Sequence, residues 1–258
     1  NKAYHIATTG RRGPVLIDLP MNIQRSEVEN PVYDMTFEDI HTDAAQAQKA
    51  ADTILEALET AKRPVIMLGH GVDSSASQRE LIQFARKRQI PIITSVLAKS
   101  VLGYEHPLNF GCIGGAYGHR YANMIANAKS DLLLCFGISL CTRQIGTKVH
   151  EFAKGAKIIR VDIDSCNLQR DIHENGANEV KLQAETGAVI DCLSRAAVQK
   201  PDEYREWLNV CNEIKENLQA VDDQTPERYP NRMIASLSEM LEDTSAIAVD
   251  VGQHMVWS

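Results

Sequence analysis

The feature that most constrains this chain is an alternation of helical patterns with short, almost wholly apolar runs between residues 44 and 198. The helical pattern begins at Ala44 and extends through Leu58, where apolar positions recur with the spacing of one helix face. Strands that are apolar along their whole length are typical of parallel sheets, because helices cover both faces of such a sheet. We therefore predict a parallel, doubly wound α/β domain, whose strands are Pro64–Leu68, Ile90–Thr94, Asp131–Phe136, Lys157–Val161 and the less apolar run Val180–Leu182.

The segments on either side of this domain carry strand and helix patterns without a complete domain around them. Pro14–Leu19 follows the end of a helix and reads as a buried strand, and a polar connector comes after it. Beyond the domain, a charged helical stretch, Pro201–Gln219, and a second helix precede Ala246–Val251, which also reads as a buried strand. We accordingly divide the chain into the end of one domain (1–28), a linker (29–43), a central domain (44–198), and linker helices with the start of another domain (199–258).

Composition excludes several classes of function. The formal net charge of -7 gives no electrostatic reason to bind nucleic acid or an anionic membrane surface. No apolar run approaches the roughly 20 residues that span a bilayer, and no apolar signal stretch opens the chain. The six cysteines include no CxxC pair and read as small buried hydrophobes rather than zinc ligands. We expect a cytoplasmic protein with reduced thiols and with neither nucleic-acid nor membrane partners.

Three separated stretches carry a resemblance to a known family. They are Gly10–Pro20 (GRRGPVLIDLP), a central series between Gly69 and Asp164, and Val249–Trp257 (VDVGQHMVW). The central series consists of GHGV at 69–72, GCIGGAYGH at 111–119, SDLLLCFG at 130–137, TRQIG at 142–146 and IIRVDID at 158–164. In this order and spacing, the stretches resemble thiamine diphosphate-dependent enzymes of the acetolactate synthase-like family. The first resembles the end of their pyrimidine-binding domain and the last the opening of their diphosphate-binding domain; the central domain of the family has a Rossmann-like, deoxyhypusine synthase-like NAD/FAD-binding fold.

The resemblance implies an enzyme that decarboxylates or joins 2-keto acids with thiamine diphosphate and Mg²⁺. It places the activating glutamate in the amino-terminal domain and the magnesium site in a later Gly-Asp-Gly segment, so we expect no catalytic residue and no metal site within these 258 residues. Gly252, Gln253 and His254 match positions that approach the diphosphate in the family. We therefore expect this chain to be inactive alone, and its full-length parent to be a homo-oligomer, either a dimer or a tetramer.

The resemblance also implies a possible site for flavin adenine dinucleotide (FAD), because acetolactate synthases bind FAD in the central domain. The candidate contacts are glycine loops whose backbone amides can meet a pyrophosphate, together with one arginine and two acidic residues, namely Gly69, Gly71, Gly114, Gly115, Arg143, Asp162 and Asp164. Against flavin, Ser139 stands where flavin-binding relatives carry an arginine, which removes a fixed cation. The two aspartates also fit ordinary turn and helix-capping roles. The sequence leaves FAD binding, an adapted nucleotide cleft and a purely structural spacer as alternatives.

A second hypothesis, from another class of function, is a stand-alone nucleotide-binding or regulatory module that uses the central α/β cleft, as in deoxyhypusine synthase-like or sirtuin-like folds. The strand patterns at Pro14–Leu19 and Ala246–Val251 count against this hypothesis, because each would then lack a sheet to join.

Overall fold

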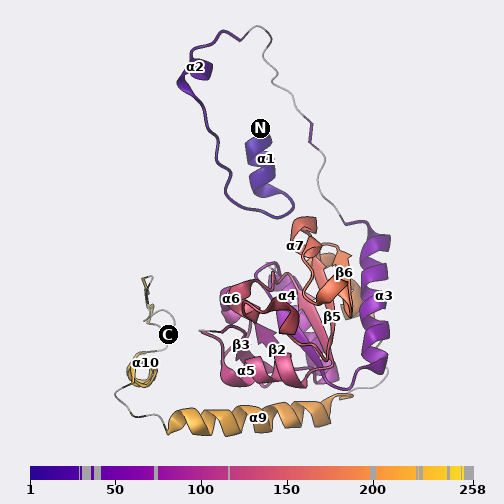
Figure 1. The fold of residues 1–258 in the computed structure, drawn as a ribbon, viewed down its shortest axis with the longest axis vertical. Helices are drawn as coiled ribbons and strands as arrows, with labels where there is room; N and C mark the ends of the chain where they lie inside the picture. The colour runs from indigo at the N-terminus through magenta and orange to yellow at the C-terminus, as the bar shows by residue number, and fades with distance from the viewer. Residues whose placement is uncertain are drawn as a thin grey trace.

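A computed structural model of the chain describes residues 1–28, 30, 36–37, 42–72, 75–115, 117–197, 202–224, 226, 229–242, 245–250 and 252. Its centre is a six-stranded sheet in the order β3-β2-β1-β4-β5-β6, in which all neighbours run parallel (Figure 1). The order reverses between β1 and β4, so right-handed crossovers place connections on both faces. The predicted doubly wound parallel sheet is therefore confirmed. Its strands are β1 (Pro64–Leu68), β2 (Ile92–Thr94), β3 (Asn109–Cys112), β4 (Leu132–Phe136), β5 (Lys157–Asp162) and β6 (Glu179–Gln183).

The longer helices of the sheet unit pack through amphipathic faces. α3 (Ala44–Thr60) begins after Asp43, whose side chain accepts a hydrogen bond from the amide of Ala45 and so caps the helix. Alanine and larger aliphatic residues recur along its buried face. α3 packs against α8 (Thr186–Arg195), which also packs against α4 (Ser75–Arg88). The shorter connecting elements are η1 (Val96–Val101), α5 (Arg120–Met124), the π-helical turn η2 (Ile125–Lys129), α6 (Thr142–Ile145), η3 (Val149–Glu151), α7 (Ser165–Gln169) and η4 (Glu174–Gly176).

β5 contributes a buried charge that organises the loop between α7 and β6. The side chain of Arg160 is 2% exposed, and its guanidinium donates to the carbonyl oxygens of Asn167 at 2.5 Å and Arg170 at 2.7 Å. One of its nitrogens also lies 3.6 Å from a carboxylate oxygen of Glu179 in β6. Removing one partner of a buried ion pair leaves an uncompensated charge, so this pair holds the loop in one arrangement.

The hydrophobic core extends past residue 198 into α9 (Arg205–Asp223). The phenol of Tyr204 donates to the carbonyl oxygen of Leu58 at 2.6 Å, and the indole of Trp207 donates to that of Pro64 at 2.9 Å. Both aromatic residues are buried in the same core as the sheet. The first half of α9 is thus part of the sheet unit, and Figure 1 shows the helix running along its lower side.

The flanking segments do not form the strands that were predicted for them. Residues 14–19 are extended, unpaired and exposed, and Leu16 retains 93% of its accessible surface. Residues 245–250 are likewise exposed and outside any strand, while Val251 lies outside the described residues. A strand needs a neighbour for its backbone groups and an apolar layer for its side chains. Among the described residues, neither segment has either partner, so both predictions of a buried strand are wrong for this structure.

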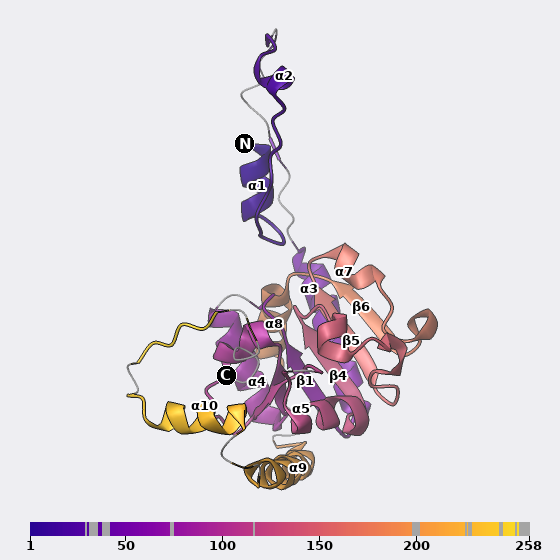
Figure 2. The same cartoon turned by 60° about the vertical axis from the view of Figure 1, so that its left-hand side comes forward.

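Three further helices lie in the flanks, α1 (Lys2–Thr8), α2 (Met21–Gln24) and α10 (Pro230–Glu239). None of them contains a buried residue. In Figures 1 and 2, α1 and α2 stand clear of the sheet unit, at the top of both views. No helix in the described part of the chain combines the length and the apolar character that crossing a membrane requires.

Candidate functional site

A crevice opens at the carboxyl ends of β1, β4 and β5, where the strand order reverses. In doubly wound sheets, ligands bind at this switch point. Its cavity has a volume of about 380 Å³ and is lined by the loops that follow the three strands and by an amino-terminal segment. Three of the predicted contacts, Gly69, Gly71 and Asp162, lie in its wall. This crevice is the candidate site of the sheet unit.

The glycines in the crevice bring two strand ends into backbone contact. A Cβ atom at Gly69 would lie 2.0 Å from the carbonyl oxygen of Gly137, and one at Gly71 would lie 2.7 Å from the Cα of Gly137. The amide of Gly69 donates to Phe136 at 2.9 Å, and that of Gly71 donates to Gly137 at 3.0 Å. Both amides are therefore engaged in the fold. The absence of a side chain at these glycines allows the two strand ends to pack closely at the switch point.

The two aspartates after β5 differ in role. One carboxylate oxygen of Asp162 accepts from the amide of Asp164 at 2.9 Å, and the other accepts from the side-chain amide of Asn167 at 2.7 Å. Asp164 caps α7 by accepting from the amide of Cys166 at 2.9 Å, and it forms an ion pair with Arg11. Asp164 therefore takes the capping role, whereas Asp162 faces the crevice. The Arg11 guanidinium, helped by the Cys166 amide, holds the pKa of Asp164 below its usual value.

Positive charge reaches the crevice from a distant part of the sequence. Arg11 and Arg12, which follow α1, line the cavity together with His70 from the loop after β1. Neither arginine was among the predicted site residues. The signal that could have found them is the GRRG sequence directly before an apolar run. Because Arg11 is paired with Asp164 and the Asp162 carboxylate lies in the same wall, the crevice carries both charges and suits a polar ligand.

The other predicted contacts lie away from the crevice. Gly114 is clamped by the side-chain amide of Asn123, which accepts from its amide at 3.3 Å and donates to its carbonyl at 2.9 Å. The amide of Gly115 donates to the carbonyl oxygen of Arg143 at 3.2 Å. The side chain of Arg143 is exposed on α6 and does not line the cavity. The loop after β3 is thus fixed to α5 through Gly114 and to α6 through Gly115.

These observations bear on whether the crevice fits FAD. The amides of Gly69 and Gly71 already donate hydrogen bonds to backbone carbonyl oxygens. Arg143 does not line the cavity, so it does not supply the positive charge that is missing at Ser139. The carbonyl oxygen of Ser139 instead accepts from the guanidinium of Arg170 at 2.5 Å, which fixes this loop. The cavity of about 380 Å³ continues into a neighbouring pocket of about 120 Å³, which shares Gly71 and Asp162 with it and adds Thr186 to the wall. At Gly69, Gly71 and Ser139, the described residues therefore offer neither an unbonded amide nor an arginine side chain to a pyrophosphate.

The predicted thiamine diphosphate contacts lie at the carboxyl end of the chain. Gly252 is described and half-buried, whereas Gln253 and His254 lie outside the described residues. Within the part of the chain that the structure describes, no group of three or more histidine, cysteine, aspartate or glutamate side chains could hold a metal ion. We therefore derive no step of thiamine or metal chemistry from these residues.

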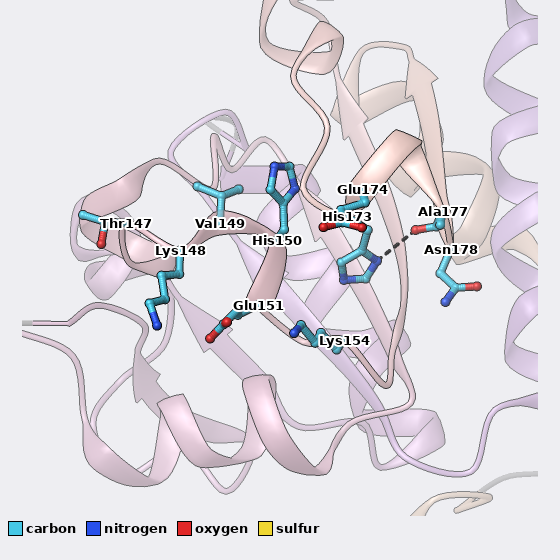
Figure 3. Close-up of a pocket in the computed structure, with 10 residues that line it drawn as sticks. All are labelled: Thr147, Lys148, Val149, His150, Glu151, Lys154, His173, Glu174, Ala177 and Asn178. Carbon is cyan, nitrogen blue, oxygen red and sulfur yellow. Dashed lines mark hydrogen bonds between the residues drawn. The ribbon is translucent and has the colours of Figure 1, made fainter.

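A second cavity, of about 700 Å³, lies between η3 and η4 (Figure 3). Its wall carries side chains of both charges, including Lys148, Lys154 and Glu174. His173 lies at its base, where the two ring nitrogens face the carbonyl oxygens of Ala177 and Phe152, each at 2.9 Å. This imidazole is thus committed to joining the two short helices. The balanced charges of this wall favour no single class of ligand.

Comparison with known proteins gives one consistent result. A family described as "Thiamine pyrophosphate enzyme, central domain" matches residues 51–193. The probable acetolactate synthase large subunit of Methanocaldococcus jannaschii is 30% identical over 271 aligned residues, which cover 99% of this chain and 44% of that protein. Acetolactate synthase isozyme 1 large subunit of Escherichia coli is 32% identical over 267 residues, with coverage of 99% and 44%. The chain therefore spans less than half the length of the curated relatives it matches.

Proposed function

We propose, given that this chain belongs to the thiamine pyrophosphate enzymes of the acetolactate synthase-like family, that it is the central part of a thiamine diphosphate- and Mg²⁺-dependent enzyme acting on 2-keto acids. The observation that carries the proposal is the continuous similarity to acetolactate synthase large subunits over 99% of the chain, flanks included. Thiamine diphosphate, when bound, stabilises the carbanion that forms when a 2-keto acid loses carbon dioxide. A stand-alone nucleotide-binding module would leave the similarity of the flanks unexplained.

The proposal assigns a role to each part of the chain. Residues 1–28 end a pyrimidine-binding domain, 29–43 are a linker, and 44–198 form the central domain. Residues 199–258 supply linker helices, the first of which packs on the central domain, and the opening of a diphosphate-binding domain, where Gly252, Gln253 and His254 approach the diphosphate. The exposed apolar side chains of the flanks support this assignment, because Leu16 and Met240 retain 93% and 81% of their surface. In the full-length parent, a cytoplasmic dimer or tetramer, other segments cover these side chains.

The activity test uses the full-length protein that contains these 258 residues. Incubation with pyruvate, thiamine diphosphate and Mg²⁺ should release carbon dioxide and yield acetolactate, followed by ¹H NMR. Omission of thiamine diphosphate is the control. A panel of other 2-keto acids then defines the substrate range. No turnover of any 2-keto acid by the cofactor-loaded protein would contradict the proposal.

The 258-residue chain itself provides a second test. Because the glutamate and magnesium segments are expected elsewhere, calorimetric titration with thiamine diphosphate and Mg²⁺ should show no tight binding. Affinity in the micromolar range would show that the complete cofactor site lies within this chain. That result would overturn the division of roles while leaving the family membership intact.

We further propose that the crevice of the parent does not retain FAD. The engaged amides of Gly69 and Gly71, the serine at position 139 and the exposed position of Arg143 support this proposal. The measurement is the visible absorption spectrum of the purified parent after denaturation, with a sample of the same protein mixed with a known amount of FAD as the recovery control. Stoichiometric flavin in the denatured sample would refute it.

A further inference from the structure

A third cavity lies at the β3 edge of the sheet, outside the crevice and outside every residue that we assigned to a cofactor. It has a volume of about 240 Å³ and sits between β3, η1 and α9. At about 30 Å³ for each water molecule in the liquid, this is room for roughly eight waters. The residues that define its chemistry are Lys99, Leu102, Tyr104, His119, Tyr121 and Lys215.

Lys215 is the central feature of this cavity. Its side chain is half-buried, and its ammonium group lies 5.7 Å from the ring centre of Phe110, 5.9 Å from that of Tyr121 and 6.0 Å from that of Tyr104. It donates one hydrogen bond, of 3.2 Å, to the carbonyl oxygen of Asn109. An ammonium group has three donors, and the ring faces attract the charge without accepting a directed bond from each of them. Lys215 thus lines the cavity with an ammonium group that makes one hydrogen bond and has three donors.

The charges around the cavity are all of one sign. Lys99 joins Lys215 in the wall, and no aspartate or glutamate lines it. No carboxylate among the described residues lies within 4.0 Å of the Lys215 ammonium. The nearby Cys112 thiol supplies no negative charge, because burial raises its pKa. A half-enclosed cavity with two cations and no anion attracts a negatively charged ligand.

The rest of the wall combines apolar and aromatic residues with the polar residues Thr94 and Asn109. Leu102 is buried, Tyr121 is 3% exposed, and Tyr104 is largely exposed at the rim of the cavity. The imidazole of His119 stacks obliquely on the ring of Tyr121, with 5.0 Å between their centres. Flat surfaces of this kind bind the body of a planar or aliphatic molecule.

We propose that this cavity binds a small organic carboxylate, whose carboxylate group meets Lys215 and Lys99 and whose flat or aliphatic body lies against Tyr104 at the rim. The two lysines come from different elements, Lys215 from α9 and Lys99 from η1. The ligand therefore joins α9 to the edge of the sheet. By mass action, it should stabilise the docked position of α9 over any undocked one.

The experiment titrates the 258-residue chain with benzoate, a planar carboxylate of suitable size, by calorimetry and by saturation-transfer NMR. Benzamide, which has the same shape without the charge, is the ligand control. Lys215→Gln removes the charge and Lys215→Arg keeps it. Lys154→Gln is the matched protein control, because it removes the same charge from the wall of the cavity in Figure 3. Thermal melts of each variant establish that it is folded.

The expected result is saturable benzoate binding that weakens roughly tenfold to a hundredfold in Lys215→Gln, as for loss of a charge-assisted hydrogen bond. Binding should persist in Lys215→Arg and Lys154→Gln, and benzamide should bind much more weakly than benzoate. Three outcomes would overturn the proposal: no saturable benzoate binding to the unmodified chain, equal binding by folded Lys215→Gln, or equal binding of benzamide. If Lys215→Gln fails to fold, the Lys99→Gln variant takes its place with the same criteria.

Discussion

Two stretches of this chain have nearly the same sequence and opposite surroundings. Pro14–Ile17 reads PVLI and Pro64–Met67 reads PVIM. In the second, Ile66 has no exposed surface, because β1 lies between β2 and β4, whereas Leu16 of the first stretch is 93% exposed. Both stretches lie within the similarity to acetolactate synthases, which covers 99% of the chain. An apolar strand pattern in a sequence thus indicates side chains that need to be buried. Whether they are buried depends on the strands and helices that lie beside the segment.

The largest expected effect comes from trimming the two stretches in parallel. Ile66→Ala should lower the free energy of unfolding by about 4 kcal/mol, because it leaves a cavity between paired strands. Leu16→Ala should change it by less than about 0.5 kcal/mol, because the side chain is already in water. Urea denaturation followed by circular dichroism compares them. An equal loss in both variants would mean that the flank is packed in solution.

Two glycines, Gly69 in the sheet unit and Gly13 in the flank, allow the same comparison for the backbone. Gly69→Ala should cost about 3 kcal/mol, because the added carbon would lie 2.0 Å from a carbonyl oxygen of the facing strand end. Gly13→Ala in the flank is the matched control, since nothing lies within 4 Å of its added carbon. Thermal and urea unfolding of both variants give the values. If Gly69→Ala were as stable as Gly13→Ala, the switch point would be more open than the structure shows.

A smaller difference in unfolding free energy is expected between a tyrosine at the packed start of α9 and a tyrosine in the exposed flank after it. Tyr204→Phe removes the donor to the carbonyl oxygen of Leu58 and should cost about 1.5 kcal/mol. Burial raises the pKa of the Tyr204 phenol, so the hydroxyl remains a donor at all ordinary pH values. Tyr229→Phe, at an exposed tyrosine just before α10, should have no measurable effect. The docking of α9 would need revision if the two changes in unfolding free energy were alike.

The smallest effect concerns the contact that joins the amino-terminal flank to the sheet unit. A double-mutant cycle of Arg11→Gln and Asp164→Asn should give a coupling of about 0.5 kcal/mol or less at pH 7, because Arg11 is largely exposed. Asparagine keeps the helix cap, so the cycle isolates the charge. The pKa of Asp164 is lowered in the folded chain, so the stabilisation is present above the carboxyl's ordinary pKa and is lost as the pH falls through the lowered one. Unfolding at pH 7 and pH 3 measures this, and a coupling that grows on acidification would contradict the ion pair.

The sheet could be predicted from the sequence because its inner strands are buried on both faces. β1, β2 and β4 are buried at every position, which leaves a run of apolar residues in the sequence. β3 is absent from the predicted strands, because this edge strand alternates half-buried and buried positions. The flanking segments were assigned to strands on the same apolar signal, without the neighbours that a strand requires.

The candidate site could be predicted only in part, for a different reason. Gly69, Gly71 and Asp162 follow strands whose ends meet at the switch point, so topology alone brings them together. Topology cannot say that the glycine amides would be engaged by the facing strand end. It also cannot place Arg11 and Arg12, which reach the crevice from a segment outside the sheet. Gly114 and Gly115 are held away from the crevice by Asn123 of α5 and Arg143 of α6, contacts that no motif specifies.

The packing of α9 on the sheet unit also determines where the far end of this helix lies. Its 19 residues form a rod about 28 Å long at about 1.5 Å per residue. Tyr204 and Trp207 attach the start of this rod to the sheet unit, and Ile214 and Leu218 pack against the same core farther along it. The helix is therefore held over most of its length, so its direction is fixed as well as its starting point. Whatever follows α9 in the chain begins at a position that the sheet unit determines.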